Sequence, residues 1–343
     1  MEYFTLKEMN QSPSCLELKK SITEIVRGFA IIFVILGHIL GGTFGLTSTH
    51  VTMLLGTGGV NIFLFLSGYG LFESYRVKGL NFRLFWNKKL NKIFIPYGII
   101  TILYYGYLSL MHQQPGRTFL LENILCIDFT RSIDGTMWYM SYILIWYGVF
   151  FLVFYFDYNV LFKIGLVWLI GSNFSAYWLH NIFQECSYQF SINAYSFPMG
   201  LLAAYIMAYI NHNIYITSHV RDVIGYIIAG LSVVVFILGN LQVINVAYWE
   251  YGLCEFIILY KFIELLLYKL QIPLKALKYI GQNPFLLYLI EAKFIRIIGG
   301  IDLAQHNIWI FSILYFVVMI ATVYAFNWTQ QTCRRFFSEI KKR

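Results

Sequence analysis

Residues 25–44 read IVRGFAIIFVILGHILGGTF, an apolar run interrupted by one arginine and one histidine. A run of about 20 such residues is long enough to cross the hydrocarbon core of a bilayer as a helix. The whole chain has the same character, since 59% of its 343 residues are hydrophobic and only 12% are charged, against roughly a quarter charged in a soluble domain. The sequence therefore predicts an all-α, polytopic membrane protein.

Similar apolar runs recur along the chain and predict about ten membrane-spanning helices, with modest tilt allowed. The expected spans are 25–44, 52–74, 93–111, 137–155, 160–176, 194–211, 222–240, 244–267, 281–299 and 308–328. No polar block between them is long enough to form a separate folded domain. We therefore expect one transmembrane domain over residues 25–328, preceded by a cytoplasmic segment 1–24 and followed by a basic cytoplasmic tail 329–343.

The distribution of lysine and arginine predicts the orientation of these spans. An even number of spans places both termini on one side of the membrane. With both termini in the cytoplasm, 20 of the 25 Lys and Arg are cytoplasmic, two are outside and three lie within spans. This asymmetry follows the positive-inside rule. The longest cytoplasmic connection, 75–92, is strongly basic. Because the positive charge flanks the spans and forms no continuous stripe, nucleic-acid binding is not expected.

Two ionisable residues, Arg27 and His38, share one face of the first span. They are eleven residues apart, which is about three helical turns plus 20° and about 16 Å along the axis. An ionisable residue inside a span is a candidate for function, and imidazole suits proton removal from a hydroxyl near neutral pH. The alternative is a histidine satisfied by a neighbouring helix and an arginine that reaches the lipid headgroups.

Five segments of the sequence carry a resemblance to a known family. They are Arg27-Gly28-Phe29-Ala30 with Leu36-Gly37-His38, GVNIFLFLSGY over 59–69, the basic stretch 83–92 followed by Pro96-Tyr97, MWYM over 137–140, and GQNPFLLYLIE over 281–291. Each segment is a weak motif alone. Their order, together with the expected number of spans, resembles the acyltransferase-3 family of integral membrane acyltransferases, over roughly residues 20–328.

The resemblance implies transfer of an acyl group, with acetyl expected, from cytosolic acetyl-CoA to a hydroxyl group. The acceptor would be a surface polysaccharide, a lipid-linked sugar or a related molecule, as for an O-acetyltransferase. It also implies a place in the bacterial cytoplasmic membrane, with membrane lipid and a carbohydrate or glycolipid as partners. No metal is expected, and a homo-oligomer is left open.

The resemblance, joined to residue type and charge, assigns roles to individual side chains. His38 would take the acceptor's proton or briefly carry the acyl group, and Arg27 would hold the thioester end of the donor or CoA itself. Cations of the cytoplasmic connection would bind the CoA phosphates, namely Arg83, Lys88, Lys89 and Lys92. The expected substrate-binding residues are Asn61, Ser67, Trp138, Tyr139, Asn283, Tyr288 and Glu291.

Several of these assignments have a plainer alternative. The basic connection as a whole could bind anionic lipid headgroups, which is the favoured interpretation for it. Asn61 and Ser67 could serve helix packing. Trp138 and Tyr139 could belong to an aromatic belt at the membrane interface, which is favoured over a platform for a sugar ring.

The last motif departs from the family pattern at two positions. Pro284 stands where the family usually has serine, and Glu291 stands where it usually has histidine. Glu291 could accept a hydrogen bond or act as a base. A structural ion pair with Lys293 or Arg296 is the favoured interpretation.

A transporter or flippase for a sugar-lipid or small polar solute is the alternative function. Gly-broken spans that contain ionisable residues would suit transport, and here these are Glu255, Lys261, Glu264 and Arg296. An inverted repeat between the two halves would favour transport, but none is evident in the sequence.

The five cysteines form no CxxC pair and do not cluster with histidine, so neither a zinc site nor a redox motif is predicted. Cys126 and Cys186 both fall in expected outside connections. A disulfide could join them there if the two connections meet.

Overall fold

The computed structural model describes residues 18–43, 50–111, 117–130, 135–176, 179–214, 217–298, 310 and 313–325, and every regular element among them is helical. The all-α class is therefore confirmed for this part of the chain. The α-helices are α1 (Lys20–His38), α2 (His50–Lys78), α3 (Phe82–Lys89), α4 (Ile95–Leu110), α5 (Arg117–Ile124), α6 (Trp138–Tyr155), α7 (Val160–Ser175), α8 (His180–Phe183), α9 (Ser187–Ile192), α10 (Ser196–Asn213), α11 (Ser218–Asn240), α12 (Tyr248–Tyr268), α13 (Lys275–Gln282) and α14 (Pro284–Ile298), with a further helix over Ile313–Ala325.

Each expected span overlaps one of these helices, and several of them are long and apolar enough to cross a membrane. In the described part of the chain, five stretches meet both conditions: Lys20–Gly41, Leu54–Lys78, Phe82–Leu110, Trp138–Tyr155 and Ser218–Asn240. The bent pair Val160–Ser175 and His180–Ile192 makes a sixth if it is one span. These helices fit an integral membrane protein. The number ten, the side of each terminus and the domain limits stay predictions.

The basic segment between the second and third expected spans, 75–92, is mostly helical, and only 79–81 is a non-helical link. α2 continues to Lys78, and α3 begins at Phe82 after Asn81, whose side chain accepts a hydrogen bond from the Leu84 amide at 3.0 Å. This N-cap satisfies a free amide of the first turn. A π-helical turn, η3 (Leu90–Phe94), then joins α3 to α4. The basic residues therefore lie along a helix that leads into a span.

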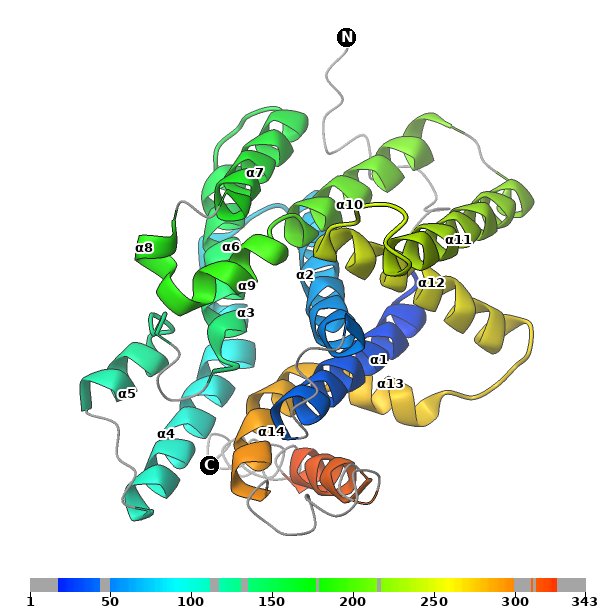
Figure 1. Cartoon of the computed structure of the whole chain (residues 1–343). Coiled ribbons are helices and arrows are strands. Elements are labelled where there is room, and N and C mark those ends of the chain that lie inside the picture. The colour runs from blue at the N-terminus through cyan, green and yellow to red at the C-terminus, as the bar shows by residue number, and fades with distance from the viewer. Residues whose placement is uncertain are drawn as a thin grey trace, which may run out of the picture.

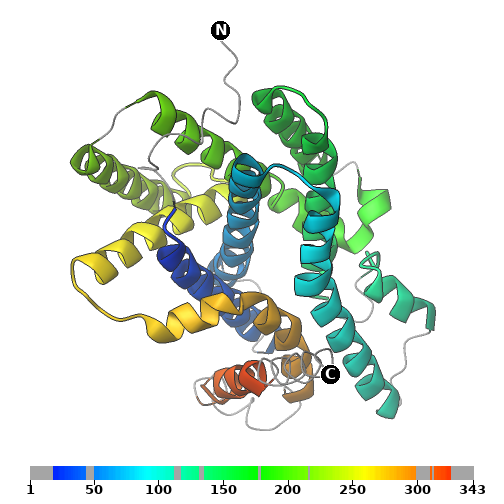
Figure 2. The same cartoon turned by 180° about the vertical axis from the view of Figure 1, so that it is seen from behind.

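The first two helices lie at the centre of the molecule, with α6 to α9 on one side and α10 to α12 on the other (Figure 1). Seen from behind, α3 and α4 run as one long rod past α2, and the far end of α4 approaches α14 (Figure 2). The space framed by α1, α2, α3 to α4, α6 and α14 is where the candidate site lies.

Glycine fixes the crossing of α2 and α10. A Cβ atom on Gly68 would lie 2.2 Å from the carbonyl oxygen of Phe197, and a Cβ on Gly200 would lie 2.1 Å from that of Phe65. Only a residue without a side chain allows two helix backbones to approach so closely. This crossing anchors α2, which carries Ser67 into the site.

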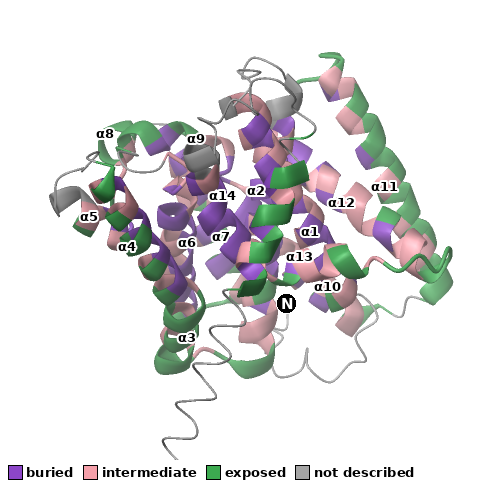
Figure 3. Ribbon diagram, turned by 90° about the horizontal axis from the view of Figure 1, so that it is seen from below, coloured by how far each residue is buried: buried purple, intermediate pink, exposed green. Residues whose placement is uncertain are grey.

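Aromatic packing holds α6 against its neighbours. Trp146 is fully buried, and its ring stacks on Phe197 of α10 at a centroid distance of 5.1 Å. Figure 3 shows buried residues gathered around α2, α6 and α7, whereas α11 is mostly exposed or half-buried. Only 11% of the apolar window of α11 is buried within the structure. An exposed, strongly apolar helix of this kind fits an integral membrane protein.

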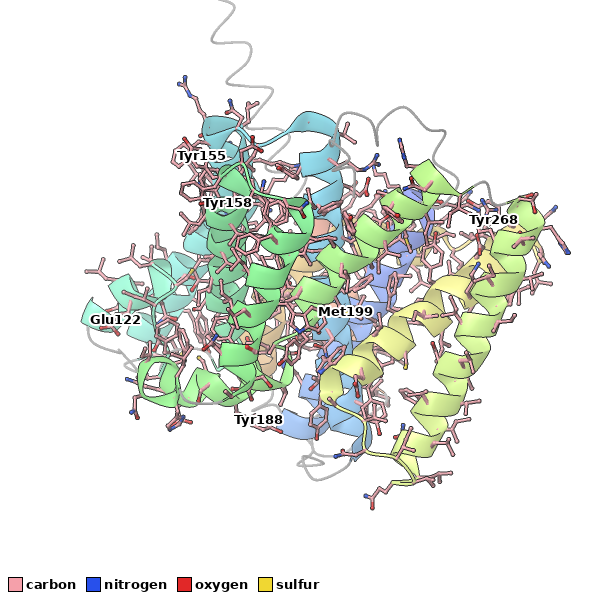
Figure 4. The ribbon with its side chains drawn as sticks, turned by 90° about the horizontal axis from the view of Figure 1, so that it is seen from above. Glu122, Tyr155, Tyr158, Tyr188, Met199 and Tyr268 are labelled. Atoms are coloured by element: carbon pink, nitrogen blue, oxygen red, sulfur yellow. The ribbon has the colours of Figure 1, made fainter. Side chains whose placement is uncertain are left out.

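Exposed tyrosines lie at two ends of the helix bundle. Tyr155 and Tyr158, near the α6 to α7 connection, lie at one end, and Tyr188 of α9 lies at the other (Figure 4). Tyr268, at the end of α12, lies toward the same end as Tyr155. Tyrosine at both borders of an apolar layer is typical of a membrane protein.

Candidate active site

A cavity of about 990 Å³ opens between α1, α2, α3, α6 and the junction of α13 and α14. Its wall is apolar in one part, where Ile31, Val34 and Val60 contribute side chains, and basic in another. The basic part contains five cations: Arg27, Lys78, Lys88, Lys89 and Lys92. No aspartate or glutamate belongs to the described wall.

The cations of the cavity form no direct ion pair within the described residues, and the one carboxylate whose charge acts on Arg27 there is Glu24. None of the ion pairs formed there includes Arg27, Lys88 or Lys89. Lys88 lies close enough to Lys92, Lys89 and Lys78 for their charges to repel it. Lys89 places its ammonium group 3.4 Å from the ring centroid of Tyr147, a cation–π contact that leaves its charge uncancelled. The cavity is therefore an electropositive site suited to an anion.

Arg27 is fixed at the cavity by the contact between α1 and α13. A Cβ on the adjacent Gly28 would lie 2.3 Å from the carbonyl oxygen of Leu277, and one on Gly281 would lie 1.6 Å from that of Glu24. The two backbones touch at these glycines, so Arg27, which directly precedes Gly28, has a set position. The first and the last sequence motif each contain one of these glycines, and the crossing tolerates nothing larger.

Hydroxyl groups from α2 and α6 surround the guanidinium of Arg27. Tyr139 and Tyr147 lie close enough to Arg27 to interact with its charge, and the hydroxyl of Ser67 lies close enough to interact with both phenols. Tyr139 also packs edge-on against Tyr288 of α14, with ring centroids 5.4 Å apart. Tyr288 in turn donates a hydrogen bond to the carbonyl oxygen of Thr136. The aromatic wall thus connects α6 with α14 across the site.

His38 and Glu291 form a close pair next to the cavity. The Nδ1 atom of His38 lies 2.6 Å from Oε1 of Glu291. The carboxyl group is fully buried, whereas the imidazole is 34% exposed. Val34, four residues before His38, and Tyr288, three residues before Glu291, both line the cavity. Since such residues share a helix face, the pair lies about one turn beyond the end of the cavity.

This pair has the geometry of a base with an orienting carboxylate. A neutral histidine carries its hydrogen on one ring nitrogen and a lone pair on the other. When Nδ1 donates to Glu291, Nε2 is the nitrogen that can accept a proton. Tyr315 also donates a hydrogen bond to the backbone carbonyl of Glu291, which ties this turn of α14 to the last described helix.

The sequence favoured Lys293 or Arg296 as the partner of Glu291, and the structure places His38 at its carboxyl group. Lys293 is buried, and its ammonium lies 3.7 Å from the sulfur of Met137. The side chain of Arg296 lies outside the described residues. Through Glu291, α14 therefore contacts the face of α1 that carries Arg27 and His38.

Most of the expected site residues meet at the cavity. Those that line it are Arg27, Ser67, Lys88, Lys89, Lys92, Tyr139, Asn283 and Tyr288. His38 and Glu291 lie at its end, as described above. Their roles in donor binding, acceptor binding and catalysis stay predictions.

Besides His38 and Glu291, three expected site residues do not line the cavity. Arg83 lies on the exposed face of α3. Asn61 is buried between helices, where it accepts a hydrogen bond from Ser196 at 2.6 Å and donates one to the carbonyl oxygen of Tyr248. Trp138 packs against the rings of Tyr139, Tyr142 and Phe190. The contacts of Asn61 fit helix packing, which was the plainer alternative for this residue.

Two cavity residues were missed from the sequence. Lys78 was taken as part of a connection, although it ends the helical run of α2 and projects with the other cations. Tyr147 has no motif of its own. Its position two turns after Tyr139 on α6 places both phenols on similar faces of the helix, and this spacing was the available signal.

The disulfide that the sequence left open between Cys126 and Cys186 is not formed. Both cysteines are buried, and neither belongs to a disulfide. The Cys186 thiol lies 3.4 Å from the carbonyl oxygen of Phe129, and burial raises the pKa of the Cys126 thiol to about 12. The described residues contain no group of three or more His, Cys, Asp or Glu side chains placed to hold a metal ion.

Comparison with known protein families finds a match, which covers the part of the chain that contains this site. A family model described as an acyltransferase domain matches residues 23–328, which include both glycine crossings, the cavity and the His38–Glu291 pair. No curated protein and no solved structure shows significant similarity to the chain. The resemblance noted in the sequence is confirmed, and the chain belongs to the acyltransferase-3 family.

Proposed function

We propose that this membrane acyltransferase moves an acetyl group from acetyl-CoA to a hydroxyl group of a carbohydrate or glycolipid acceptor. The observation that carries the proposal is that the basic cavity lies next to the His38–Glu291 pair. A cavity lined by five cations without a carboxylate ends about one helical turn from a histidine held by a buried glutamate.

The cavity fits the donor by charge and size. CoA carries several phosphate negative charges on a long, thin body, and a volume of about 990 Å³ is within the range of small-molecule sites. Lys78, Lys88, Lys89 and Lys92 would neutralise the phosphates as point charges. Arg27, deeper along α1, would hold the thioester end through its planar fork.

The same cations belong to the set that the charge pattern assigns to the cytoplasm. We therefore place the mouth of the cavity on the cytosolic side, where acetyl-CoA is made available. His38 lies further along α1, away from that side. A donor that enters among the lysines would point its acyl group past Arg27 and toward His38.

The transfer itself needs one base and no added reactant. The acceptor hydroxyl oxygen forms a bond to the thioester carbonyl carbon while Nε2 of His38 takes its proton. The carbon–sulfur bond then breaks, and the proton passes from His38 to the CoA thiolate. Glu291 keeps Nδ1 protonated and stabilises the transient imidazolium, as a buried carboxylate does for the catalytic histidine of a Ser-His-Asp triad.

The partial exposure of His38 fits access by a large acceptor. With 34% of its side chain exposed, the imidazole can be reached from outside the donor cavity. A sugar hydroxyl could therefore approach from the opposite side to CoA. We propose a surface polysaccharide or lipid-linked sugar at a bacterial cytoplasmic membrane as the acceptor class.

Direct transfer of label tests this function. Purified protein is incubated with radiolabelled acetyl-CoA and candidate glycans, and ester-linked label is released with mild base. Base-labile label on a glycan that depends on His38 is expected. Donor binding without transfer to any hydroxyl, combined with transport of a sugar-lipid in vesicles, would contradict the proposal and favour the transporter instead.

A further inference from the structure

A buried lysine of α7 lies behind the cavity wall. Lys163 is only 2% exposed, and its ammonium group donates a hydrogen bond to the hydroxyl of Tyr75 at 3.0 Å. The ammonium also lies 5.3 Å from the ring of Tyr75 and 5.7 Å from that of Phe154. Tyr75 lines the cavity, whereas Lys163 does not.

This lysine is costly for the fold. Burial removes the hydration of its charge, and no acidic side chain of the described residues forms an ion pair with it. It also lies in the first turn of α7, which begins at Val160, where the helix dipole disfavours a cation. Three unfavourable terms at one side chain indicate that something besides packing retains it.

The direction of the hydrogen bond shows what the lysine does to Tyr75. A protonated lysine has three donors and no acceptor, so the phenol oxygen must be the acceptor. The phenolic hydrogen then remains to be donated elsewhere. No described group accepts it. A hydroxyl that already accepts from a cation is a stronger donor, because chained hydrogen bonds polarise one another.

We infer that Lys163 is a positioning residue for the anionic acyl donor, acting through Tyr75. The ammonium orients the Tyr75 hydroxyl so that its hydrogen is offered to a phosphate oxygen of the donor within the cavity. This inference rests on the proposed function, since it names a further contact of the same donor. The Tyr75 hydroxyl, polarised by the Lys163 ammonium, would thus be a neutral hydrogen-bond donor beside the five cations of the cavity.

Removal of the buried charge gives opposite predictions for a positioning and a purely structural lysine. If Lys163 positions Tyr75, Lys163→Met fills similar volume without the desolvation cost, so the melting temperature should hold or rise. The KM for acetyl-CoA should rise about tenfold, since one charge-assisted hydrogen bond to the donor is weakened, while kcat changes little. A structural lysine should lower the melting temperature and leave KM unchanged.

Three further variants make the test specific. Tyr75→Phe should raise KM at least as much as Lys163→Met does, and the double variant should be no worse than Tyr75→Phe alone, because both changes act on the same contact. Lys269→Met is the matched control. That lysine also lies over a tyrosine ring, at 5.4 Å from Tyr226, but is exposed and outside the cavity. Its KM should equal that of the parent.

The outcomes separate this inference from the proposed function. A folded Lys163→Met protein with a KM within twofold of the parent overturns the inference, whatever its melting temperature, and so does a double variant with additive losses. If Lys163→Met does not fold, the KM of Lys163→Gln is measured instead. This variant keeps a hydrogen-bond donor without the charge, and the same twofold criterion applies to it. A parent protein that neither binds CoA by calorimetry nor transfers acetyl refutes the proposed function, and the inference with it.

Discussion

Two groups of cations in this molecule have opposite surroundings. On α12, Lys261 contacts one oxygen of Glu264 at 2.7 Å, and Lys19 contacts the other at 3.0 Å. Around the cavity, Arg27, Lys88 and the other cations of the wall form no direct ion pair with a carboxylate among the described residues. Charge on α12 is neutralised within the fold and serves its architecture. Charge at the cavity is left to be neutralised by something that enters.

The comparison also bears on the alternative function. Lys261 and Glu264 were two of the intramembrane ionisable residues that favoured a transporter. The structure binds them to each other and to the segment before α1, which gives them a structural role. Within the described residues, four cavity cations that form no ion pair, Arg27, Lys88, Lys89 and Lys92, belong to the acyltransferase motifs, so the contrast favours donor binding over a transport path.

Arg27 gives the largest expected effect on this contrast. Arg27→Ala removes the guanidinium from a site without another fork-shaped donor among its described residues, so kcat/KM for acetyl-CoA should fall about 100-fold. Arg27→Lys keeps the charge but loses the planar fork and should also be impaired. Steady-state transfer kinetics on protein of confirmed thermal stability would measure both changes.

Arg76 provides the matched control for that prediction. It is already paired with Glu73 at 2.6 Å and does not line the cavity, so Arg76→Lys should retain parent kinetics. Equal losses for Arg27→Lys and Arg76→Lys would mean that any arginine at this end of the bundle matters, and the distinction between paired and unpaired cations would fail.

The lysines of α3 should give an intermediate effect. A protein with both Lys88→Ala and Lys89→Ala should show a KM for acetyl-CoA raised about tenfold with kcat preserved. Its KM should also depend less on salt than that of the parent, because fewer charges attract the donor. Unchanged KM, with weaker association to vesicles of anionic lipid, would return this segment to the lipid-binding interpretation.

The smallest effect on activity is expected from the paired lysine. Lys261→Met should leave KM and kcat unchanged and lower the free energy of unfolding by about 1 kcal/mol, since it removes one of two partners of Glu264. Thermal unfolding in detergent measures the stability. A raised KM for acetyl-CoA in this variant would contradict the claim that the paired cations of α12 have no part in donor binding.

Hydropathy and helical periodicity predicted the parts of this structure that depend on neighbours in the sequence. The apolar runs located the helices, and the spacing of Arg27 and His38 put both on one face of α1. The basic stretch was interpreted as a connection because its charges interrupt the apolar pattern, although α3 begins there after the N-cap residue Asn81. Charge alone is a poor guide where a helix emerges from the membrane surface.

Contacts between distant segments could not be predicted in the same way. Glu291 had two nearby cations on its own helix, Lys293 and Arg296, and local spacing favoured them. Its observed contact is with His38 of α1, which depends on how α14 is placed by the aromatic contact between Tyr139 and Tyr288. Lys163 was likewise unremarkable in the sequence, because its burial behind Tyr75 is set by the packing of α7.

Acetyl transfer by His38 variants that still bind CoA tests the central claim most directly. His38→Ala and His38→Gln cannot take a proton, so transfer should fall by about 100-fold or more, while calorimetric binding of CoA at the cavity stays at the parent level. Thermal stability and membrane level are measured beside both. Folded His38→Gln and His38→Ala proteins that transfer acetyl at the parent rate would contradict the account and move the transporter to first place.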